Sequence, residues 1–400
     1  MFSPRVKTGA FVLEGVNAFA TTLYFNYLFF HMREQFGFTN LGNLFLAAAN
    51  GLIYAVSVWF AGRFAQRKGY FRALRIGFLT MAFALAGAGC VDRLGTGYAG
   101  MVFWTLGMSL TWPSLEAIVS ERESSQRLQR LLGVYNVVWA GGSALAAFVG
   151  GGLRDTFGAR SIFFVPATLH LFQWIVAWRL DRASAATVAA ARAQPPPPDD
   201  ADHRERCRSP VPPAVFMKMA WVANPFSYVA INALIPVIPQ RAADLHLGPV
   251  AAGVFSSIWY FARAAAFVLL WQWTGWHYRF KWLVGAYLAM AACFAVVLVG
   301  GSLWLLVGAQ LVFGLGVGLA YYSSLYYSMD VGETKGEHGG FHEAALGTGI
   351  FAGPAIGAVS LRFFPDWPNM NTWAASALLM IGLAALYWLR YRRPSKSRKP

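Results

Sequence analysis

The chain has 400 residues, of which 57% are hydrophobic and only 13% are charged, and its mean hydropathy is +0.44. Soluble domains carry about 25% charged residues, so this composition excludes a cytosolic enzyme, a disordered chain and a secreted disulfide scaffold. The three cysteines, Cys90, Cys207 and Cys293, have neither the spacing of a zinc site nor that of a disulfide framework. The composition therefore indicates a membrane protein that crosses the bilayer many times.

Apolar runs follow one another along the chain with short polar breaks, and each is close to the length of about 20 residues that crosses a bilayer as a helix. Continuous runs indicate helices, because the strands of a membrane barrel alternate in runs of about ten residues. No cleavage site follows the first run, which we expect to remain in the mature protein. We predict an all-α fold with twelve transmembrane helices, at residues 9–31, 40–62, 73–91, 97–119, 131–153, 161–179, 214–239, 250–272, 282–300, 302–328, 341–361 and 372–390.

A polar segment at residues 181–213 divides these helices into two groups of six. It contains four consecutive prolines, Pro195 to Pro198, followed by mixed charges, and we expect a mobile cytoplasmic linker. We predict an N-terminal six-helix bundle at 1–180 and a C-terminal six-helix bundle at 214–400, which ends in a basic tail.

Lys and Arg predict the orientation, because they gather in cytoplasmic loops. Of the 33 basic residues, 26 fall in the termini, the linker and the loops on the same side, six fall in the alternate loops, and Arg263 falls inside a span. This distribution indicates that the net charge of +15 reflects the orientation of the chain in the membrane rather than nucleic-acid binding. We expect both termini in the cytoplasm and the protein in the lipid bilayer of a bacterial inner membrane.

The two groups of helices look like internal repeats. Residues of the first group recur in the second, in the same order and with a shift of 207: Asn17, Phe19, Gly142, Ala146 and Gly150 recur as Asn224, Phe226, Gly349, Gly353 and Gly357. Pseudo-symmetric bundles around a site at the membrane midplane are the architecture of many secondary transporters.

The first predicted cytoplasmic loop reads GRFAQRKGYFR at residues 62–72. It resembles the loop signature of the major facilitator superfamily, in which Gly62 and Gly69 match the glycines and Gln66 stands where the family usually has an aspartate. Gly349, Gly353, Pro354 and Gly357 resemble the glycine–proline motif of the superfamily's antiporters, which usually lies in the fifth span.

Glycines four residues apart share one face of a helix in two of the spans. Small residues let helices approach closely, so these faces could be where the two bundles slide or hinge; ordinary close packing is the alternative. Pro354 removes one backbone hydrogen bond and can bend its helix. The faces are formed by Gly142 and Gly150 in one span and by Gly349, Gly353 and Gly357 in the other.

Arg263 is the most deeply placed charge of the sequence. It lies 13 residues after Val250, or about 20 Å along a helix, within a hydrocarbon core about 30 Å thick. A charge at this depth is costly and marks a functional site by default. Because guanidinium groups match carboxylates and phosphates, we expect Arg263, with Tyr260 on the same face, to bind an anionic group of the solute. A structural pair with a buried acid is the alternative.

Three acids lie in the cytoplasmic third of their predicted spans: Glu14, Glu116 and Glu343. Burial disfavours the charged form of a carboxyl group, so these acids are candidates for proton coupling. The alternative is an acid exposed to water or paired with a loop arginine. For Glu343 we favour this alternative, because it lies at the start of a predicted span and acids suit helix N-termini.

Histidines give weaker signals than the acids. His170 lies with Gln173 in one span, and His342 lies beside Glu343. No set of His, Cys, Asp and Glu residues has the spacing of a metal site, and we expect neither a metal nor a cofactor.

Polar side chains form stripes on four of the spans. The resemblance to the superfamily implies that the first, fourth, seventh and tenth spans line a central cavity. Asn, Tyr and Trp suit a solute that has both apolar and hydrogen-bonding surface. The implied solute-binding residues are Asn17, Thr21, Tyr24, Trp112, Asn224, Tyr228, Asn232, Ser323 and Tyr327.

We predict a monomeric secondary active transporter that moves a small organic solute, anionic or amphiphilic, by alternating access. Protons are the expected energy source, because no phosphate-binding loop is visible. A permease for neutral sugars or nucleosides is the main alternative and requires Arg263 to be paired internally. A non-transporting sensor on the same fold is another. The chain shows no catalytic constellation, so we do not expect an enzyme.

Overall fold

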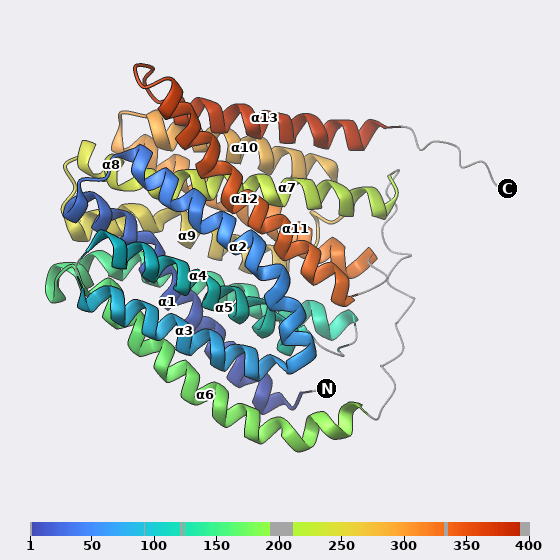
Figure 1. Cartoon of the computed structure of the whole chain (residues 1–400). Helices are drawn as coiled ribbons and strands as arrows, with labels where there is room; N and C mark the ends of the chain where they lie inside the picture. The colour runs from blue at the N-terminus through green and yellow to red at the C-terminus, as the bar shows by residue number, and fades with distance from the viewer. Residues whose placement is uncertain are drawn as a thin grey trace.

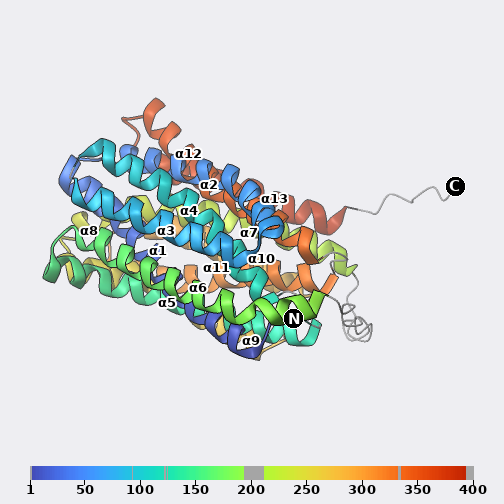
Figure 2. The ribbon, with the colours of Figure 1, turned by 60° about the horizontal axis from the view of Figure 1, so that its bottom comes forward.

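The computed structural model describes residues 2–91, 93–120, 123, 125–192, 211–331 and 335–392. Throughout these residues the regular secondary structure is helical, and none of them forms a strand. The long helices lie side by side along one common direction (Figure 1, Figure 2). The helical fold predicted from the apolar runs is therefore confirmed.

Six long helices precede residue 193, and we call them the first half. They are α1 (Pro4–Phe36), α2 (Asn40–Lys68), α3 (Tyr70–Cys90), α4 (Leu94–Ser120), α5 (Ser125–Phe157) and α6 (Ser161–Arg192).

The remaining helices follow residue 212, and we call them the second half. They are α7 (Pro213–Leu234), the single turn η2 (Ile235–Val237), the short α8 (Ile238–Asp244), α9 (Pro249–Gln272), α10 (Phe280–Val299), α11 (Leu303–Val331), α12 (Lys335–Phe363) and α13 (Met370–Tyr391).

Ten helical segments in the described part of the chain are long and apolar enough to cross a membrane. They correspond to ten of the twelve predicted spans. The other two predicted spans fall in α1 and α4, which are long enough but carry polar side chains such as Glu14, Asn17 and Glu116 along their length. The chain is therefore a multi-pass helical protein, and the crossing of the bilayer by α1 and α4 stays a prediction.

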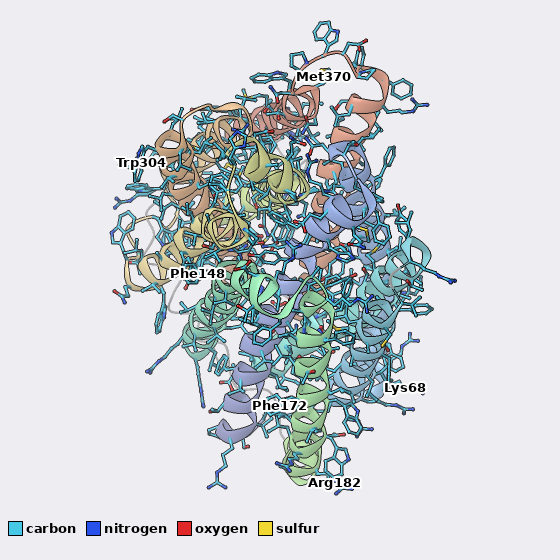
Figure 3. All side chains as sticks on the ribbon, turned by 90° about the vertical axis from the view of Figure 1, so that its left-hand side faces the viewer. Lys68, Phe148, Phe172, Arg182, Trp304 and Met370 are labelled. Atoms are coloured by element: carbon cyan, nitrogen blue, oxygen red, sulfur yellow. The ribbon has the colours of Figure 1, made fainter. Side chains whose placement is uncertain are left out.

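The outer surface of the bundle is rich in large apolar side chains. Phe60, Phe83, Phe363 and Ile381 are all exposed, and Trp304 is 81% exposed. Viewed from the end opposite the termini, Trp304 lies at the outer edge of the molecule (Figure 3). Soluble proteins rarely expose so much apolar surface, so this surface is suited to lipid.

The predicted linker begins too early. Helix α6 continues to Arg192, so residues 181–192 belong to the helix. The reason is local: this stretch is rich in alanine, the best helix former, and mixed charge alone does not end a helix. The prolines from Pro195 to Pro198 lie outside the described residues.

Glycines with positive φ angles end three helices of the first half. Gly37, Gly69 and Gly158 have φ angles of 67°, 100° and 80°, which residues with a Cβ rarely adopt. Gly69 of the predicted signature loop thus serves the sharp turn between α2 and α3. Gly62 of the same loop lies inside α2, and a Cβ there would meet no other atom within 4 Å.

The two halves contact each other along two helix pairs. Helix α2 packs along α12, and α5 packs along α9. Within the halves, α1 packs on α5 and α6, and α7 packs on α12 and α13. In Figure 1, α6 and α13 lie at opposite edges and diverge toward the end where both termini lie, which we call the termini end.

The predicted glycine faces pack mainly inside each half. A Cβ at Gly142 would lie 2.6 Å from the carbonyl oxygen of Gly15 on α1, and one at Gly349 would lie 2.2 Å from that of Pro225 on α7. Gly150 meets the Tyr27 ring and Gly353 meets Val229, again within one half. For these glycines the structure favours the alternative of close packing within a half, with the same helix pairing in both halves.

Other glycines make the closest approaches between the halves. A Cβ at Gly51 of α2 would lie 2.6 Å from the backbone of Ile350 on α12, and one at Gly151 of α5 would lie 2.1 Å from the carbonyl oxygen of Pro249 on α9. Gly357 also crosses to α2, but more loosely, at 3.3 Å from the Leu44 side chain. Pro354 lies inside α12, which continues past it to Phe363.

Replacing Gly151 with alanine should therefore separate α5 from α9. We expect Gly151→Ala to destabilise the protein by about 1–3 kcal/mol, the usual cost of overpacking, because the added methyl group would meet a backbone carbonyl that cannot rotate away. Gly152→Ala is the matched control, since a Cβ at Gly152 meets nothing within 4 Å. Thermal unfolding of the purified protein measures both, and equal unfolding temperatures would contradict this packing.

Candidate functional site

Arg263 lies in the interior, between the two halves. It belongs to the middle of α9, and its side chain is buried, with 4% of the residue exposed. Its guanidinium carbon lies 4.3 Å from the ring centre of Trp139, 5.0 Å from that of Trp259 and 5.1 Å from that of Tyr260. Because Trp139 comes from α5 of the first half, the charge is held between rings of both halves.

No acid within the described ranges forms an ion pair with Arg263, and its Nε atom has no hydrogen-bond partner. Contacts of a desolvated cation with aromatic rings contribute about 2 kcal/mol or more. The penalty for burying an ion is several kcal/mol, so the rings compensate only part of it. The structural pair with a buried acid, which was the alternative for Arg263, is not formed with any described residue.

Trp139 is the centre of a group of rings that we call the central aromatic cluster. It stacks on Tyr321 at 5.2 Å between ring centres and on Phe267 at 5.7 Å, with interplanar angles of 18° and 26°. Trp112 meets it edge to face at 6.4 Å, and Tyr228 contacts Tyr321 at 6.3 Å. The cluster consists of Trp112, Trp139, Tyr228, Phe267 and Tyr321.

Two members of this cluster, Trp112 and Tyr228, were predicted as solute-binding residues, and three were not. Trp139 had a usable signal: it lies in the middle of the predicted span 131–153, where a tryptophan cannot serve as an anchor at the membrane surface. Phe267 and Tyr321 had no such signal, because apolar and aromatic residues are frequent in every span.

The three predicted proton-coupling acids converge from three helices. The carboxyl group of Glu14 on α1 interacts electrostatically with those of Glu116 on α4 and Glu343 on α12, and Glu116 interacts with Glu343. Glu14 is fully buried, and neither of its carboxyl oxygens has a hydrogen-bond partner in the described part of the structure. Tyr135 of α5 lies beside it. The acids thus form one cluster that the sequence could not show.

Glu343 connects the two halves. The hydroxyl of Tyr54 on α2 donates a hydrogen bond to Oε2 of Glu343 at 2.8 Å, and both residues are buried. The interpretation of Glu343 as an acid at a helix N-terminus is wrong, because α12 begins at Lys335 and Glu343 lies more than two turns inside it. The helix begins before the predicted span 341–361, whose start reflects the polar residues before 341 rather than the start of the helix.

A buried ion pair lies near the acid cluster, at the start of α1. The ammonium group of Lys7 contacts the carboxylate of Glu123 and donates to the carbonyl oxygen of Val119 at 2.9 Å. Arg127 binds the same carboxylate at 3.3 Å. Lys7 and Glu123 are buried. In the sequence Lys7 indicates only the orientation of the chain, because pairing across more than a hundred residues leaves no local pattern.

Most of the other predicted solute-binding residues form hydrogen bonds within their own helix. On α1, the hydroxyl of Thr21 donates to the backbone of Asn17 at 2.7 Å, while the buried Asn17 amide has no hydrogen-bond partner among the described residues. The Ser323 hydroxyl donates a hydrogen bond of 3.0 Å to a backbone carbonyl oxygen of its own helix, and the Asn232 amide does the same at 2.9 Å. Asn224 accepts a hydrogen bond from Ser227 at 3.3 Å.

Tyr24 and Tyr327 lie away from Arg263. The Tyr24 ring packs on Trp104, at 4.7 Å, inside the first half. The Tyr327 hydroxyl accepts a hydrogen bond of 2.8 Å from the backbone of Tyr278, in the turn between α9 and α10. Of the predicted set, the structure brings Tyr228 and Tyr260 to Arg263, with which both interact electrostatically.

Hydrogen bonds also join the halves, one beside Arg263 and one at the end opposite the termini. The hydroxyl of Tyr260 on α9 donates to Oδ1 of Asn26 on α1 at 2.8 Å. The amide of Asn43 on α2 donates to the carbonyl oxygen of Pro236 at 3.1 Å. These neutral groups hold α1 and α2 against the second half.

The histidines whose side chains are described form no metal site. His170 hydrogen-bonds Gln173 at 2.8 Å, and Gln173 donates to the backbone of Leu13 at 2.9 Å, so both stabilise the first half. The side chain of His342 is not among those described. No group of three or more His, Cys, Asp and Glu residues in the described ranges is placed to hold a metal ion.

The sequence matches the family model described as Major Facilitator Superfamily over residues 10–336, which is most of the chain. The chain belongs to the major facilitator superfamily. Among the 304 solved chains that match its structure is the human organic anion transporter MFSD10 (TETRAN), with a TM-score of 0.65 and 16% sequence identity; the match covers 96% of this chain and 100% of that one. This likeness shows the fold alone. No curated protein matches the sequence.

Membership of the superfamily confirms the resemblance seen in the loop at 62–72. Together with the ten apolar helical segments, it identifies a multi-pass membrane protein of a transporter family. Members of the superfamily are transporters rather than enzymes, in agreement with the predicted function class.

Proposed function

We propose that this superfamily member is a secondary active transporter that moves a small organic anion by alternating access, coupled to protons. The observation that carries the proposal is the buried charge of Arg263, which lies between the halves without an acid partner among the described residues. An anion that binds there supplies the missing negative charge. It also binds at the junction that has to open to one side of the membrane and then to the other.

The guanidinium group suits a carboxylate because its N–H donors can form two parallel hydrogen bonds. Hydrogen bonds to charged groups contribute about 1.5–3 kcal/mol each, and the desolvated site strengthens them. The name of the structurally similar human organic anion transporter agrees with a solute of this class. A neutral-solute permease would need an internal partner for Arg263, and the described residues do not offer one.

Proton coupling rests on the acid cluster. An ionised Glu14 would be a buried charge without a cation partner among the described residues, which costs several kcal/mol, so a change in its access to water should change its proton occupancy. Glu343 connects a change in proton occupancy to the contact between the halves, because its hydrogen bond with Tyr54 joins α2 to α12. We therefore propose Glu14, Glu116 and Glu343 as the proton-coupling residues.

We further propose twelve spans in two six-helix bundles, with the termini end in the cytoplasm of a bacterial inner membrane. Exposed basic residues at this end support the orientation. They include Lys68, at the end of α2, and Arg182, near the end of α6, which are labelled in Figure 3.

Cysteine labelling tests the orientation. In a chain whose native cysteines are replaced, Arg67→Cys should react with a membrane-impermeant maleimide only after the cells are permeabilised. Asp366→Cys, at the opposite end, should react in intact cells. Labelling of both positions in intact cells would contradict an even number of spans.

Arg263→Lys tests the anion site. Lysine keeps the charge but loses the planar fork, so we expect the protein to fold and its affinity for the transported anion to fall about 10- to 150-fold, the equivalent of one charge-assisted hydrogen bond. Counterflow in proteoliposomes with a panel of carboxylates and sugars measures this effect.

Arg63→Lys is the matched control for this variant, because the Arg63 guanidinium lies over the Trp59 ring at 4.5 Å on the surface of the protein. Arg263→Ala should abolish counterflow of anions. If Arg263→Ala left anion affinity unchanged, or if only sugars exchanged, the anion proposal would be wrong.

Glutamine substitutions test the coupling. Glu14→Gln or Glu116→Gln keeps the shape of the side chain and removes its titration, so a pH gradient should no longer drive accumulation while solute exchange persists. Asp181→Asn is the control, since Asp181 pairs with Arg75 near the protein surface. Accumulation that persists in both glutamate variants would show that neither acid carries the proton.

A further inference from the structure

We infer that the transported anion carries a flat aromatic ring, which stacks on Trp139 and Tyr321 while Arg263 binds its carboxylate. This inference rests on the proposed function and narrows its solute class. It depends on three observations: the stacking of the central aromatic cluster, the division of that cluster between the halves, and two buried donors that have no acceptor.

Trp139 is the residue that connects the charge to the rings. The Arg263 guanidinium lies 4.3 Å from its ring centre, and Tyr321 stacks on it nearly parallel, with an interplanar angle of 18°. At such distances aromatic pairs favour offset-stacked or edge-to-face arrangements over a face-to-face sandwich. A carboxylate held by Arg263 therefore places the atoms attached to it beside two flat ring surfaces.

The stacked rings belong to different halves. Trp139 lies on α5, whereas Tyr321 lies on α11 and Phe267 on α9. When the halves rock apart, Trp139 must separate from Tyr321, and both lose their stacking partner. A flat ring that enters between them stacks on both and replaces the lost contact. A saturated ring is thicker and has no π surface, so it replaces only the apolar burial.

Two buried donors near Trp139 have no acceptor within the described structure. They are Nε of Arg263 and the indole Nε1 of Trp112, whose ring meets Trp139 edge to face at 6.4 Å. Unpaired buried donors are costly, and no described residue offers either of them an acceptor. The carboxylate satisfies the first, and a second oxygen on the aromatic ring, such as a hydroxyl, suits the second.

Equilibrium binding to the purified full-length protein in detergent tests the inference, and it avoids the leakage of weak acids across liposomes. The probe is radiolabelled benzoate. The unlabelled competitors are cyclohexanecarboxylate, which has the charge but not the flat ring, and benzamide, which has the flat ring but not the charge. We expect benzoate to bind about 2- to 10-fold more tightly than cyclohexanecarboxylate, the usual contribution of aromatic stacking, and benzamide not to compete.

Variants of Trp139 separate stacking from apolar packing. Trp139→Phe keeps an aromatic ring and should retain the preference for benzoate. Trp139→Leu keeps the apolar side chain and should bind both carboxylates equally. Trp178→Leu is the matched control, since Trp178 also stacks on an arginine, Arg182, at 3.9 Å but lies on α6. It should bind as the unaltered chain does.

The outcomes distinguish the inference from the proposed function. Equal affinity of the unaltered chain for benzoate and cyclohexanecarboxylate, or a preference for benzoate that survives in Trp139→Leu, overturns the aromatic inference and leaves the organic-anion proposal standing. Competition by benzamide, with binding that persists in Arg263→Ala, overturns both. Absence of benzoate binding at millimolar concentration also overturns the inference, and anion counterflow by the Arg263 variants then decides the proposed function separately.

Discussion

The buried positive charge of Arg263 is the constraint on which the rest of the site depends. A guanidinium group keeps its proton, so it cannot escape the cost of burial by becoming neutral, as a carboxyl group can. Three aromatic rings surround it and reduce this cost without removing it. A site with a permanent, partly compensated charge favours any state in which an anion is present. Binding of the proposed anion would therefore also change the stability of the contact between the halves, because Trp139 belongs to one half and Arg263 to the other.

The central aromatic cluster is close to both this charge and the acids. Tyr228 and Tyr321 lie within electrostatic range of Arg263 and also of Glu116 and Glu343. A chain of buried groups of low polarity lets charges act on one another over longer distances than they do in water. An anion that neutralises Arg263 therefore alters the field at the carboxyl groups without touching them. This gives solute and proton a physical means of influencing each other within one connected set of residues.

The features that could be predicted from the sequence are those that depend on local pattern and on the depth of a residue within its span. The apolar runs indicated the long helices, and the position of Arg263 within a run indicated a buried charge. The depth of Glu14 and Glu116 made them candidates, but nothing in their spacing showed that they approach Glu343. The contact of Trp139 with Arg263, the pair of Lys7 with Glu123 and the approach of Gly151 to Pro249 join distant segments. Such contacts follow from how α5 packs on α9 and α1 on α4, and single-sequence periodicity carries no information on that packing.

The contacts that join the halves differ in chemistry between the two ends. In the middle of α9 and opposite the termini they are neutral: Tyr260 with Asn26 beside Arg263, and Asn43 with a backbone carbonyl and Gly151 against Pro249 at the far end. A change in proton occupancy leaves them unaltered. On the termini side of the crossing of α2 and α12, the hydrogen bond from Tyr54 ends on Glu343. Hydrogen bonds to an ionised acceptor are about twice as strong as those between neutral groups, so a proton on Glu343 weakens the contact at this end alone. Of the described hydrogen bonds that join the halves, the one from Tyr54 thus ends on an acid, which is the asymmetry that the proposed coupling to protons requires.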